Sequence, residues 1–207
     1  MGVWADRVVP RLTEASLSSG ELGELRREAC APLTGRVLEL GFGSGLNLRW
    51  LPPTVTALGA VEPSDVAWRL SERRRARAKV PLERRGLDGQ QLAEPHASYD
   101  SALATFTLCS VADPERALAE VRRVVRVGGV LCLLEHGRSP DPQVARWQWR
   151  LDPVQRRVFA GCHLSRDVPA LVTAAGFEIE MMRAEQLPGP RVSRPWTYGF
   201  LLAARRT

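Results

Sequence analysis

The chain has 207 residues, of which 44% are hydrophobic and 25% charged, and its formal net charge is +6. This composition is typical of a globular protein, and the length suits one domain with a substantial core. The apolar runs are strand-sized, far shorter than the roughly 20 residues of a membrane helix, and the N-terminus lacks the apolar block of a signal peptide. We therefore expect a single domain over residues 1–207, a cytoplasmic location and no membrane anchor.

The first predicted elements surround a glycine-rich loop. An N-terminal helical segment over 1–34 precedes a strand over 37–40, which runs into Gly41, Gly43 and Gly45, after which a helical pattern begins. Glycines are needed where the backbone turns tightly and comes close to a ligand. The amides at a following helix start can hold a polar or anionic group. The stretch therefore predicts a loop for a nucleotide-type cofactor.

A second strand is predicted over 54–62, stopped by Pro63, and a helix over about 64–78 follows it. This helix holds the densest basic run, 73–79, which has no interleaved aromatic residues to stack on bases. Only Lys79 is a lysine among the 29 basic residues, which indicates a general preference for arginine rather than a selected surface. We expect a solvated helix face and no specific nucleic acid as partner. A non-catalytic nucleic-acid-binding protein is the alternative that the charge supports.

The rest of the chain continues to alternate between strand and helix patterns. Strands are predicted over 82–87, 101–106, 130–135, 177–182 and 197–203, and helices over 113–127, 144–159 and 167–175, with a proline-rich loop before the last strand. This alternation predicts an α/β protein with a doubly wound, mainly parallel sheet. Ligands of such sheets bind at the carboxyl ends of the strands. The residues expected there are Gly41 to Gly45, Glu62, Asp88, Thr105 to Ser110, Glu135 and His136.

Two acids narrow the choice of cofactor. Glu62, at the tip of the second strand, can accept both hydroxyl hydrogens of a ribose. Asp88, followed by Gly89, can accept from an adenine amino group, although a plain turn uses the same residues. Position 46 is leucine, where the dinucleotide fingerprint has glycine or alanine, and a catalytic Tyr-x-x-x-Lys pattern is missing. Both observations count against a nicotinamide-dependent reductase, which stays as an alternative.

Taken together, these residues resemble the class I S-adenosylmethionine-dependent methyltransferases over most of the chain. Residues 37–45, Val-Leu-Glu-Leu-Gly-Phe-Gly-Ser-Gly, look like the first motif of that family. Residues 124–129 are similar to its Val-Leu-Arg-Pro-Gly-Gly, with Val127 in place of the usual proline. The resemblance implies a Rossmann-like fold and S-adenosyl-L-methionine as cofactor. The cofactor-binding residues that it implies are Glu39, Gly41, Gly43, Gly45, Glu62, Pro63, Asp88, Gly89 and Thr105.

A narrower resemblance concerns the second half of the chain. The segments that carry it are Thr107 to Val111, Leu134 to His136, Leu151 to Pro153, Gly161 to Arg166 and Trp196 to Gly199. Their succession is similar to the methyltransferase branch that includes alkyl-thiol methyltransferases. It implies a small-molecule methyl acceptor, a lipophilic thiol among the possibilities, and a helical substrate-cap insertion over 138–166. An N- or O-methyltransferase of a small molecule or lipid is the alternative.

A thiol needs only modest activation, because its ordinary pKa is about 8.5. His136, just past a strand end, is the first candidate base, and His163 is the second. A structural hydrogen-bonded pair of His136 with Glu135 is the alternative. Trp147, Trp149 and Phe159 are predicted either to form an apolar lid or simply to pack in the core. The four cysteines, Cys30, Cys109, Cys132 and Cys162, form no Cys-x-x-Cys pair, so we predict neither a metal site nor a disulfide.

Overall fold

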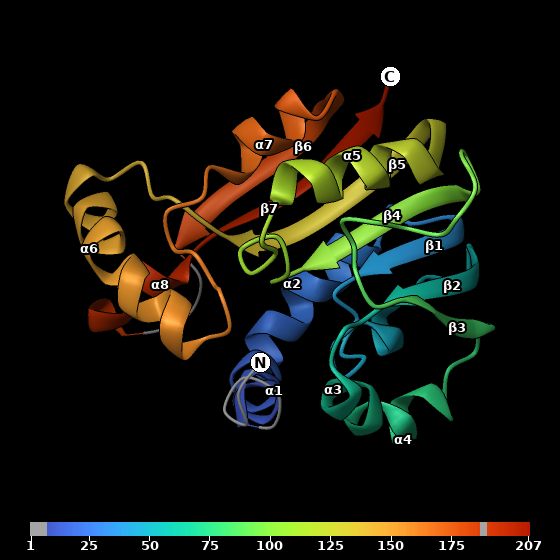
Figure 1. Ribbon diagram of the computed structural model, residues 1–207, viewed down its shortest axis with the longest axis horizontal. Helices are drawn as coiled ribbons and strands as arrows, with labels where there is room; N and C mark the ends of the chain where they lie inside the picture. The colour runs from blue at the N-terminus through green and yellow to red at the C-terminus, as the bar shows by residue number, and fades with distance from the viewer. Residues whose placement is uncertain (1–7, 187–189) are drawn as a thin grey trace.

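The structure, a computed structural model, describes residues 8–186 and 190–207. At its centre is a seven-stranded sheet with the order β3-β2-β1-β4-β5-β7-β6 (Figure 1). The strands are β1 Gly35–Leu40, β2 Val55–Val61, β3 Leu82–Gly86, β4 Tyr99–Thr105, β5 Val125–His136, β6 Phe177–Gln186 and β7 Tyr198–Arg206. β1 to β5 pair in parallel, whereas β7 runs antiparallel to both β5 and β6. The predicted doubly wound, mainly parallel sheet is confirmed.

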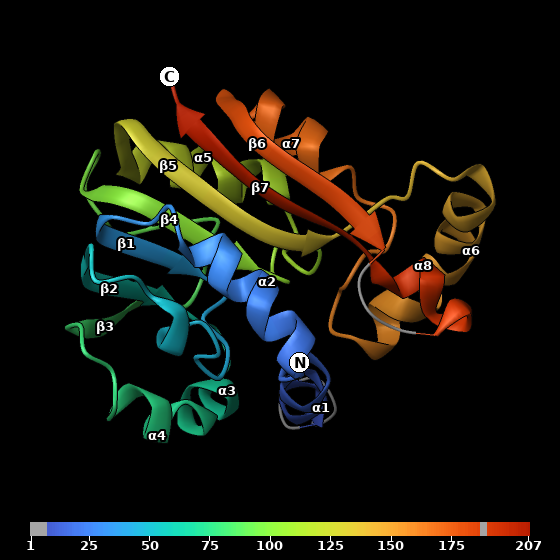
Figure 2. The same cartoon turned by 180° about the vertical axis from the view of Figure 1, so that it is seen from behind.

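Helices cover both faces of this sheet, as Figures 1 and 2 show from opposite sides. The helices are α1 Val9–Leu17, α2 Gly20–Cys30, α3 Asp65–Leu70, α4 Glu72–Arg75, α5 Pro114–Val124, α6 Pro142–Val158, α7 Val168–Ala174 and α8 Arg194–Thr197. α5 and α7 lie on one face, and α2 crosses the other. In the part of the chain that the structure describes, no helix has the length and apolarity that crossing a membrane requires.

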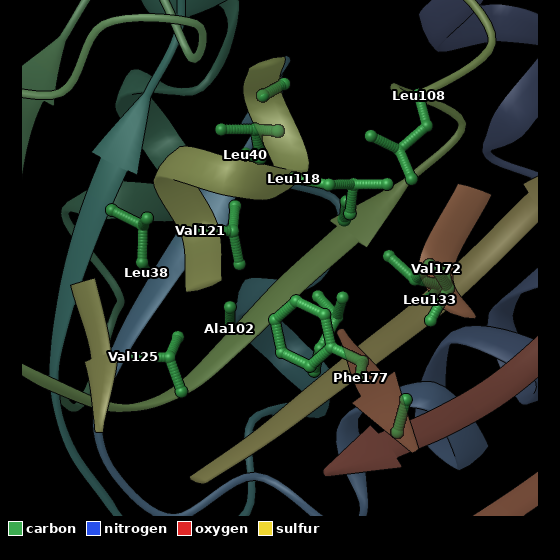
Figure 3. Packing of buried hydrophobic residues seen from close by; sticks show 14 of the residues in the cluster. Leu38, Leu40, Ala102, Leu108, Leu118, Val121, Val125, Leu133, Val172 and Phe177 are labelled. Atoms are coloured by element: carbon green, nitrogen blue, oxygen red, sulfur yellow. The ribbon is translucent and has the colours of Figure 1, made fainter. Parts of the chain in front are cut away.

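The core has two layers because successive strand residues point to opposite faces of the sheet. Figure 3 shows the layer under α5 and α7, where Leu118 and Val121 from α5 and Val172 from α7 pack against strand residues such as Leu133. The layer under α2 is built from the alternate strand positions, among them Val37, Leu103 and Cys132. Double-sided burial explains the nearly continuous apolar runs of β1, β4 and β5.

Among the predicted element boundaries that are wrong, three have a local cause. The glycine loop leads into the short 3-10 helix η2 Leu48–Trp50 and not into an α-helix, because Pro52 and Pro53 hold the preceding Leu51 extended. The helix predicted over 64–78 is divided at Ser71, whose hydroxyl donates to the Trp68 carbonyl at 2.6 Å. α5 ends at Val124, before the two glycines, since the backbone becomes extended at Val125.

The described C-terminal part places α6 and α8 together beyond the ends of β5, β6 and β7 (Figures 1 and 2). The buried Gln148 fixes this arrangement: its side-chain amide donates to the carbonyls of Gly137 and Pro195 at 2.9 and 3.1 Å, and its oxygen accepts from the Ser139 amide. β6 extends to Gln186, beyond the predicted end at 182. Part of the proline-rich loop, residues 187–189, lies outside the described residues.

Candidate functional site

The glycine loop follows β1 and bends over the tip of β2. Gly41, Gly43 and Gly45 all have positive φ angles, +68°, +59° and +77°, a conformation that glycine adopts without steric cost. A Cβ on Gly41 would lie 2.0 Å from Thr107 Oγ1, so this glycine also allows the loop to contact the segment after β4. A Cβ on Gly43 would meet nothing closer than a carbonyl oxygen at 4.0 Å. The loop is therefore packed on one side and open above Gly43.

Glu62 connects the tip of β2 to this loop. One carboxylate oxygen accepts from the Gly43 amide at 2.6 Å and the other from the Ser64 amide at 2.7 Å. Burial raises the pKa of Glu62, and these two backbone hydrogen bonds oppose the rise. The adjacent Pro63 is exposed and contributes no such contact. Glu62 therefore holds the loop while its remaining lone pairs can accept from the hydroxyls of a ribose.

A buried polar network lies beneath the loop. Asn47 donates to Glu39 Oε1 at 2.7 Å and to Thr105 Oγ1 at 3.0 Å. The guanidinium of Arg26, on α2, donates to the side-chain oxygen Oδ1 of Asn47 and to Thr105 Oγ1, both at 2.8 Å. Burial raises the pKa of Glu39 to about 8, opposed by Asn47 and Arg26. The structure thus joins the predicted Glu39 and Thr105 through Arg26 and Asn47, which sequence reasoning missed.

The turn after β3 packs against the end of β1. A Cβ on Gly89 would lie 2.6 Å from a Leu40 methyl carbon, so a glycine is needed there by close contact. Asp88 is exposed, and its carboxylate accepts from the amide and side chain of Gln90, both at 2.9 Å. These hydrogen bonds lower the pKa of Asp88. The geometry is that of a turn, and the predicted adenine contact of Asp88 stays a prediction.

One arginine of the basic run is part of the loop's support. Arg74 donates to Glu14 on α1 at 2.7 Å and to the Ser44 carbonyl at 3.1 Å. Arg75 lies 4.1 Å from the Trp68 ring centroid. These two side chains are half-buried, so the run is in part structural and not a purely solvated face.

The loop fits the predicted S-adenosylmethionine on two structural observations. The space above Gly43 is free of side chains, as close approach of a ligand to the backbone requires. Glu39 Oε2 is buried and has no hydrogen-bond partner among the described residues, which leaves a polar atom free for a ligand.

Replacing Gly43 by alanine is expected to weaken S-adenosylmethionine binding at least tenfold while the melting temperature changes by only a few degrees, because the added methyl occupies the ligand's space. Isothermal titration calorimetry and a thermal melt measure both. Gly128→Ala is the matched control, since Gly128 also has a positive φ, +76°, and open space around its Cβ position. Equal binding by both variants would show that the space above Gly43 is not used.

A second group of side chains gathers at the carboxyl ends of β4 and β5. Cys109 follows β4, His136 ends β5, and Cys162 lies in the segment after α6. One donor atom from each lies within 4.8 Å of the other two, and Cys162 Sγ is 3.1 Å from His136 Nε2. A hydrogen bond from Cys109 lowers the pKa of Cys162 and raises that of Cys109. Chain spacing did not reveal this cluster, because its members are far apart in sequence.

Glu135 and His136 do not form the structural pair considered from the sequence. The Glu135 carboxylate accepts from the amides of Thr107 and Leu108 at 2.7 and 2.9 Å, and so fixes the loop after β4. His136 turns instead to Cys162, and burial lowers its pKa to about 4. The His136 imidazole, the first candidate base, is therefore neutral at physiological pH, and its Nε2 contacts the Cys162 thiol.

His163 is oriented by a carboxylate on α6. Its Nδ1 lies 3.1 Å from Asp152 Oδ2, and its backbone amide donates to the Cys109 carbonyl at 2.8 Å. The side chain is partly exposed. A carboxylate-held imidazole at a partly open position can receive a proton from a bound molecule.

The inner face of α6 is polar. Gln148, Asp152 and Gln155 are spaced one turn apart, and Gln155 donates to Cys162 Sγ at 3.5 Å. Trp147 and Trp149 are 54% and 73% exposed, and Phe159 is 36% exposed. The aromatic residues therefore do not pack in the core, and the residues that border the cysteine–histidine cluster are amides and a carboxylate.

Comparisons with known proteins agree with this geometry. A family model described as a methyltransferase domain matches residues 38–133. Human thiol S-methyltransferase TMT1B is 36% identical over 153 residues, which are 71% of this chain and 62% of that protein. Human thiol S-methyltransferase TMT1A is 30% identical over 171 residues, 79% of this chain and 69% of that protein. The chain thus spans less than two thirds of the length of TMT1B.

The fold comparison covers the whole chain. A solved structure from Thermotoga maritima, titled an S-adenosylmethionine-dependent methyltransferase and possible histamine N-methyltransferase, has a TM-score of 0.70 at 21% identity and covers 100% of both chains. The glycine loop, its contact with Glu62 and the strand order agree with these comparisons. The chain belongs to the class I S-adenosylmethionine-dependent methyltransferases and, among them, resembles the thiol methyltransferase branch.

Proposed function

We propose that this methyltransferase acts on the sulfur of a small, lipophilic thiol. The observation that carries the proposal is the convergence of three sequence-distant segments at one edge of the sheet. His163 N donates to the Cys109 carbonyl, Cys162 contacts His136, and Arg166 donates to the Leu108 carbonyl. These are the segments that resemble thiol methyltransferases, and the curated relatives TMT1A and TMT1B carry that activity in their names.

The sheet edge that carries Cys109, His136 and Cys162, here called the acceptor edge, adjoins the glycine loop, residues 41–45. Thr107 is in van der Waals reach of Gly41, and the same residue is held by Glu135 of β5. A molecule placed over the cysteine–histidine cluster is therefore close to a cofactor bound at the glycine loop. Bound S-adenosylmethionine supplies an electrophilic methyl group on a sulfonium. The chain's own residues position it: Gly43 leaves room, Glu62 accepts from the ribose, and Glu39 offers its free oxygen.

For the acceptor, the chain must orient a thiol and remove its proton. His163 is better placed than His136 to accept this proton, because Asp152 fixes its ring and its side chain is partly exposed. His136 is buried and contacts Cys162 instead. α6 borders the same place through Asp152 and Gln155, which supports residues 138–166 as a substrate cap.

A panel of lipophilic thiols, amines and phenols tests the substrate class. With S-adenosylmethionine present, we expect S-methylated products and a matching yield of S-adenosylhomocysteine from the thiols, detected by mass spectrometry. Methylation found only on nitrogen or oxygen would reject the proposal.

The His163→Ala variant provides the internal control in this panel. We expect its rate to fall about a hundredfold with an alkyl thiol, which needs a base, and much less with an aryl thiol that ionises at neutral pH by itself. An equal loss with both acceptors would assign His163 a structural role.

A further inference from the structure

Cys109, His136 and Cys162 have the donor atoms of a transition-metal site. Two thiol sulfurs and one imidazole nitrogen lie within 4.8 Å of one another. All three residues are buried, with 2%, 8% and 8% of their surfaces exposed. Sulfur and imidazole ligands in this number favour zinc, and zinc sites that keep a position open for a substrate use three protein ligands.

The positions of the three donors are fixed by the surrounding structure. Cys109 is held through its carbonyl, which accepts from the His163 amide at 2.8 Å. His136 is the last residue of β5 and pairs with Gly199 of β7. Cys162 Sγ accepts from Gln155, whose side-chain oxygen accepts from Trp196 Nε1 at 3.0 Å. Contacts from outside the ligand set orient metal ligands; here they hold Cys109 and Cys162, whereas His136 is placed by its strand and its Nδ1 has no hydrogen-bond partner among the described residues.

We propose that Cys109, His136 and Cys162 bind a zinc ion whose fourth position takes the acceptor thiol. Ligand atoms in a tetrahedral zinc site are separated by roughly 3.5–3.8 Å, given zinc–sulfur and zinc–nitrogen lengths of about 2.3 and 2.0 Å. The present separations, from 3.1 Å to within 4.8 Å, need only small side-chain adjustments to reach that geometry. The metal site stands on these residues alone, whereas the role of the fourth position rests on the proposed function.

Coordination would make the acceptor nucleophilic. A thiol that binds zinc gives up its proton, which passes to the base assigned above and then to solvent. The acceptor sulfur uses an electron pair to form its bond to the methyl carbon. The sulfonium carbon–sulfur bond breaks, and its electrons remain on the sulfur of S-adenosylhomocysteine. The neutral thioether is a poorer ligand than a thiolate, so it leaves the metal.

The third donor distinguishes this site from a simple cysteine pair. Cys109 and Cys162 alone could form a disulfide, but a disulfide would not involve the His136 nitrogen that lies 3.1 Å from Cys162 Sγ. The chain also contains two cysteines outside the cluster, Cys30 and Cys132, both buried. These provide matched controls.

The test measures metal binding by the full chain. Protein stripped with a chelator under reducing conditions is titrated with Co²⁺ and with Zn²⁺. We expect one equivalent of each, with a sulfur-to-cobalt charge-transfer absorption band, and at least a hundredfold weaker binding in Cys109→Ala, Cys162→Ala and His136→Ala. Cys30→Ala and Cys132→Ala should bind as the unchanged protein does. A wild-type protein that binds no metal, or binding retained in all three cluster variants, would overturn the proposal.

A second measurement uses the unchanged protein and avoids the question of whether a variant folds. Zn²⁺ is expected to protect Cys109 and Cys162 from alkylation, read by peptide mass spectrometry, while the labelling of Cys30 and Cys132 is unaffected by zinc. A Cys109–Cys162 disulfide that forms in place of metal binding would overturn the site in favour of a redox pair. Metal binding without thiol methylation would reject the proposed substrate and leave the site standing. Equal thiol methylation by metal-free protein would reject the role of the fourth position.

Discussion

The Glu62→Gln variant is expected to bind S-adenosylmethionine about 10- to 100-fold more weakly than the unchanged protein, a loss of about 1.4–2.7 kcal/mol. Glutamine has one acceptor oxygen where the carboxylate has two. The Gly43 or the Ser64 amide would therefore face an NH₂ group, which distorts the loop, and the ribose would lose a charged acceptor. Isothermal titration calorimetry with S-adenosylmethionine and S-adenosylhomocysteine measures the change.

The neighbouring Asp65 supplies the control. It is exposed, and its carboxylate accepts from Arg84 Nη1 at 2.7 Å; the Arg84 hydrogen bonds to the Glu62 carbonyl come from Nε and Nη2 and do not need Asp65. Asp65→Asn removes a charge three residues away in the sequence and should leave both affinities unchanged. An affinity of Glu62→Gln within threefold of wild type would show that the acid does not contact the ligand.

The Arg26→Met variant is expected to lose about 2–4 kcal/mol of unfolding free energy, because two buried oxygens lose a donor at about 1–3 kcal/mol each. Methionine fills much of the volume but removes the donors to Asn47 Oδ1 and Thr105 Oγ1. Urea denaturation at neutral pH measures the loss. Arg27→Met is the control, because the adjacent Arg27 is exposed and pairs with Glu24 on the surface; its denaturation midpoint should hardly move. Equal losses in the two variants would contradict the role of the buried network.

The pH dependence of the unfolding free energy of Arg26→Met also tests the interaction between Arg26 and Glu39. Burial raises the pKa of folded Glu39 to about 8, from an ordinary value of 4.5. The folded state then holds a proton that the unfolded state has released, so this group lowers stability as pH rises from about 4.5 to 8. Removing Arg26 raises the folded pKa further. Stability of Arg26→Met should therefore continue to fall above about pH 8, where the contribution of Glu39 to the stability of the unchanged protein levels off. A parallel pH profile would show that Arg26 and Glu39 are not coupled.

Sequence reasoning predicted that the glycine loop and Glu62 are neighbours, as the structure has them, because their signals are local. Gly41 to Gly45 and Glu62 each follow a strand directly, and strand tips of a parallel sheet share one edge. Arg26 was missed because its partners are 21 and 79 positions away in the sequence. An arginine in a helical pattern is otherwise predicted to lie on the surface, because burying its charge without a partner is costly. No local pattern marks an arginine whose partners come from another layer.

The acceptor side was predicted less completely for a related reason. Cys109 and Cys162 lie in two separate loops and His136 ends β5, and spacing rules recognise metal ligands only when they are close in the sequence. The helical spacing of Trp147 and Trp149 left an apolar lid and core packing as alternatives, but both side chains are exposed and the α6 residues near the cluster are Asp152 and Gln155. Which face of a helix turns inward depends on its neighbours, here the Gln148 contacts to Gly137 and Pro195.

The position of β7 has a consequence for the order in which the two halves of the protein form. This strand comes last in the described chain, yet it lies between β5 and β6 and pairs with the residues up to His136. During synthesis, β1 to β4 with the glycine loop leave the ribosome well before β7 does. The half that contains the glycine loop can therefore be in place first, whereas the edge with Cys109, His136 and Cys162 waits for pairing across a long stretch of sequence, which is a slow event.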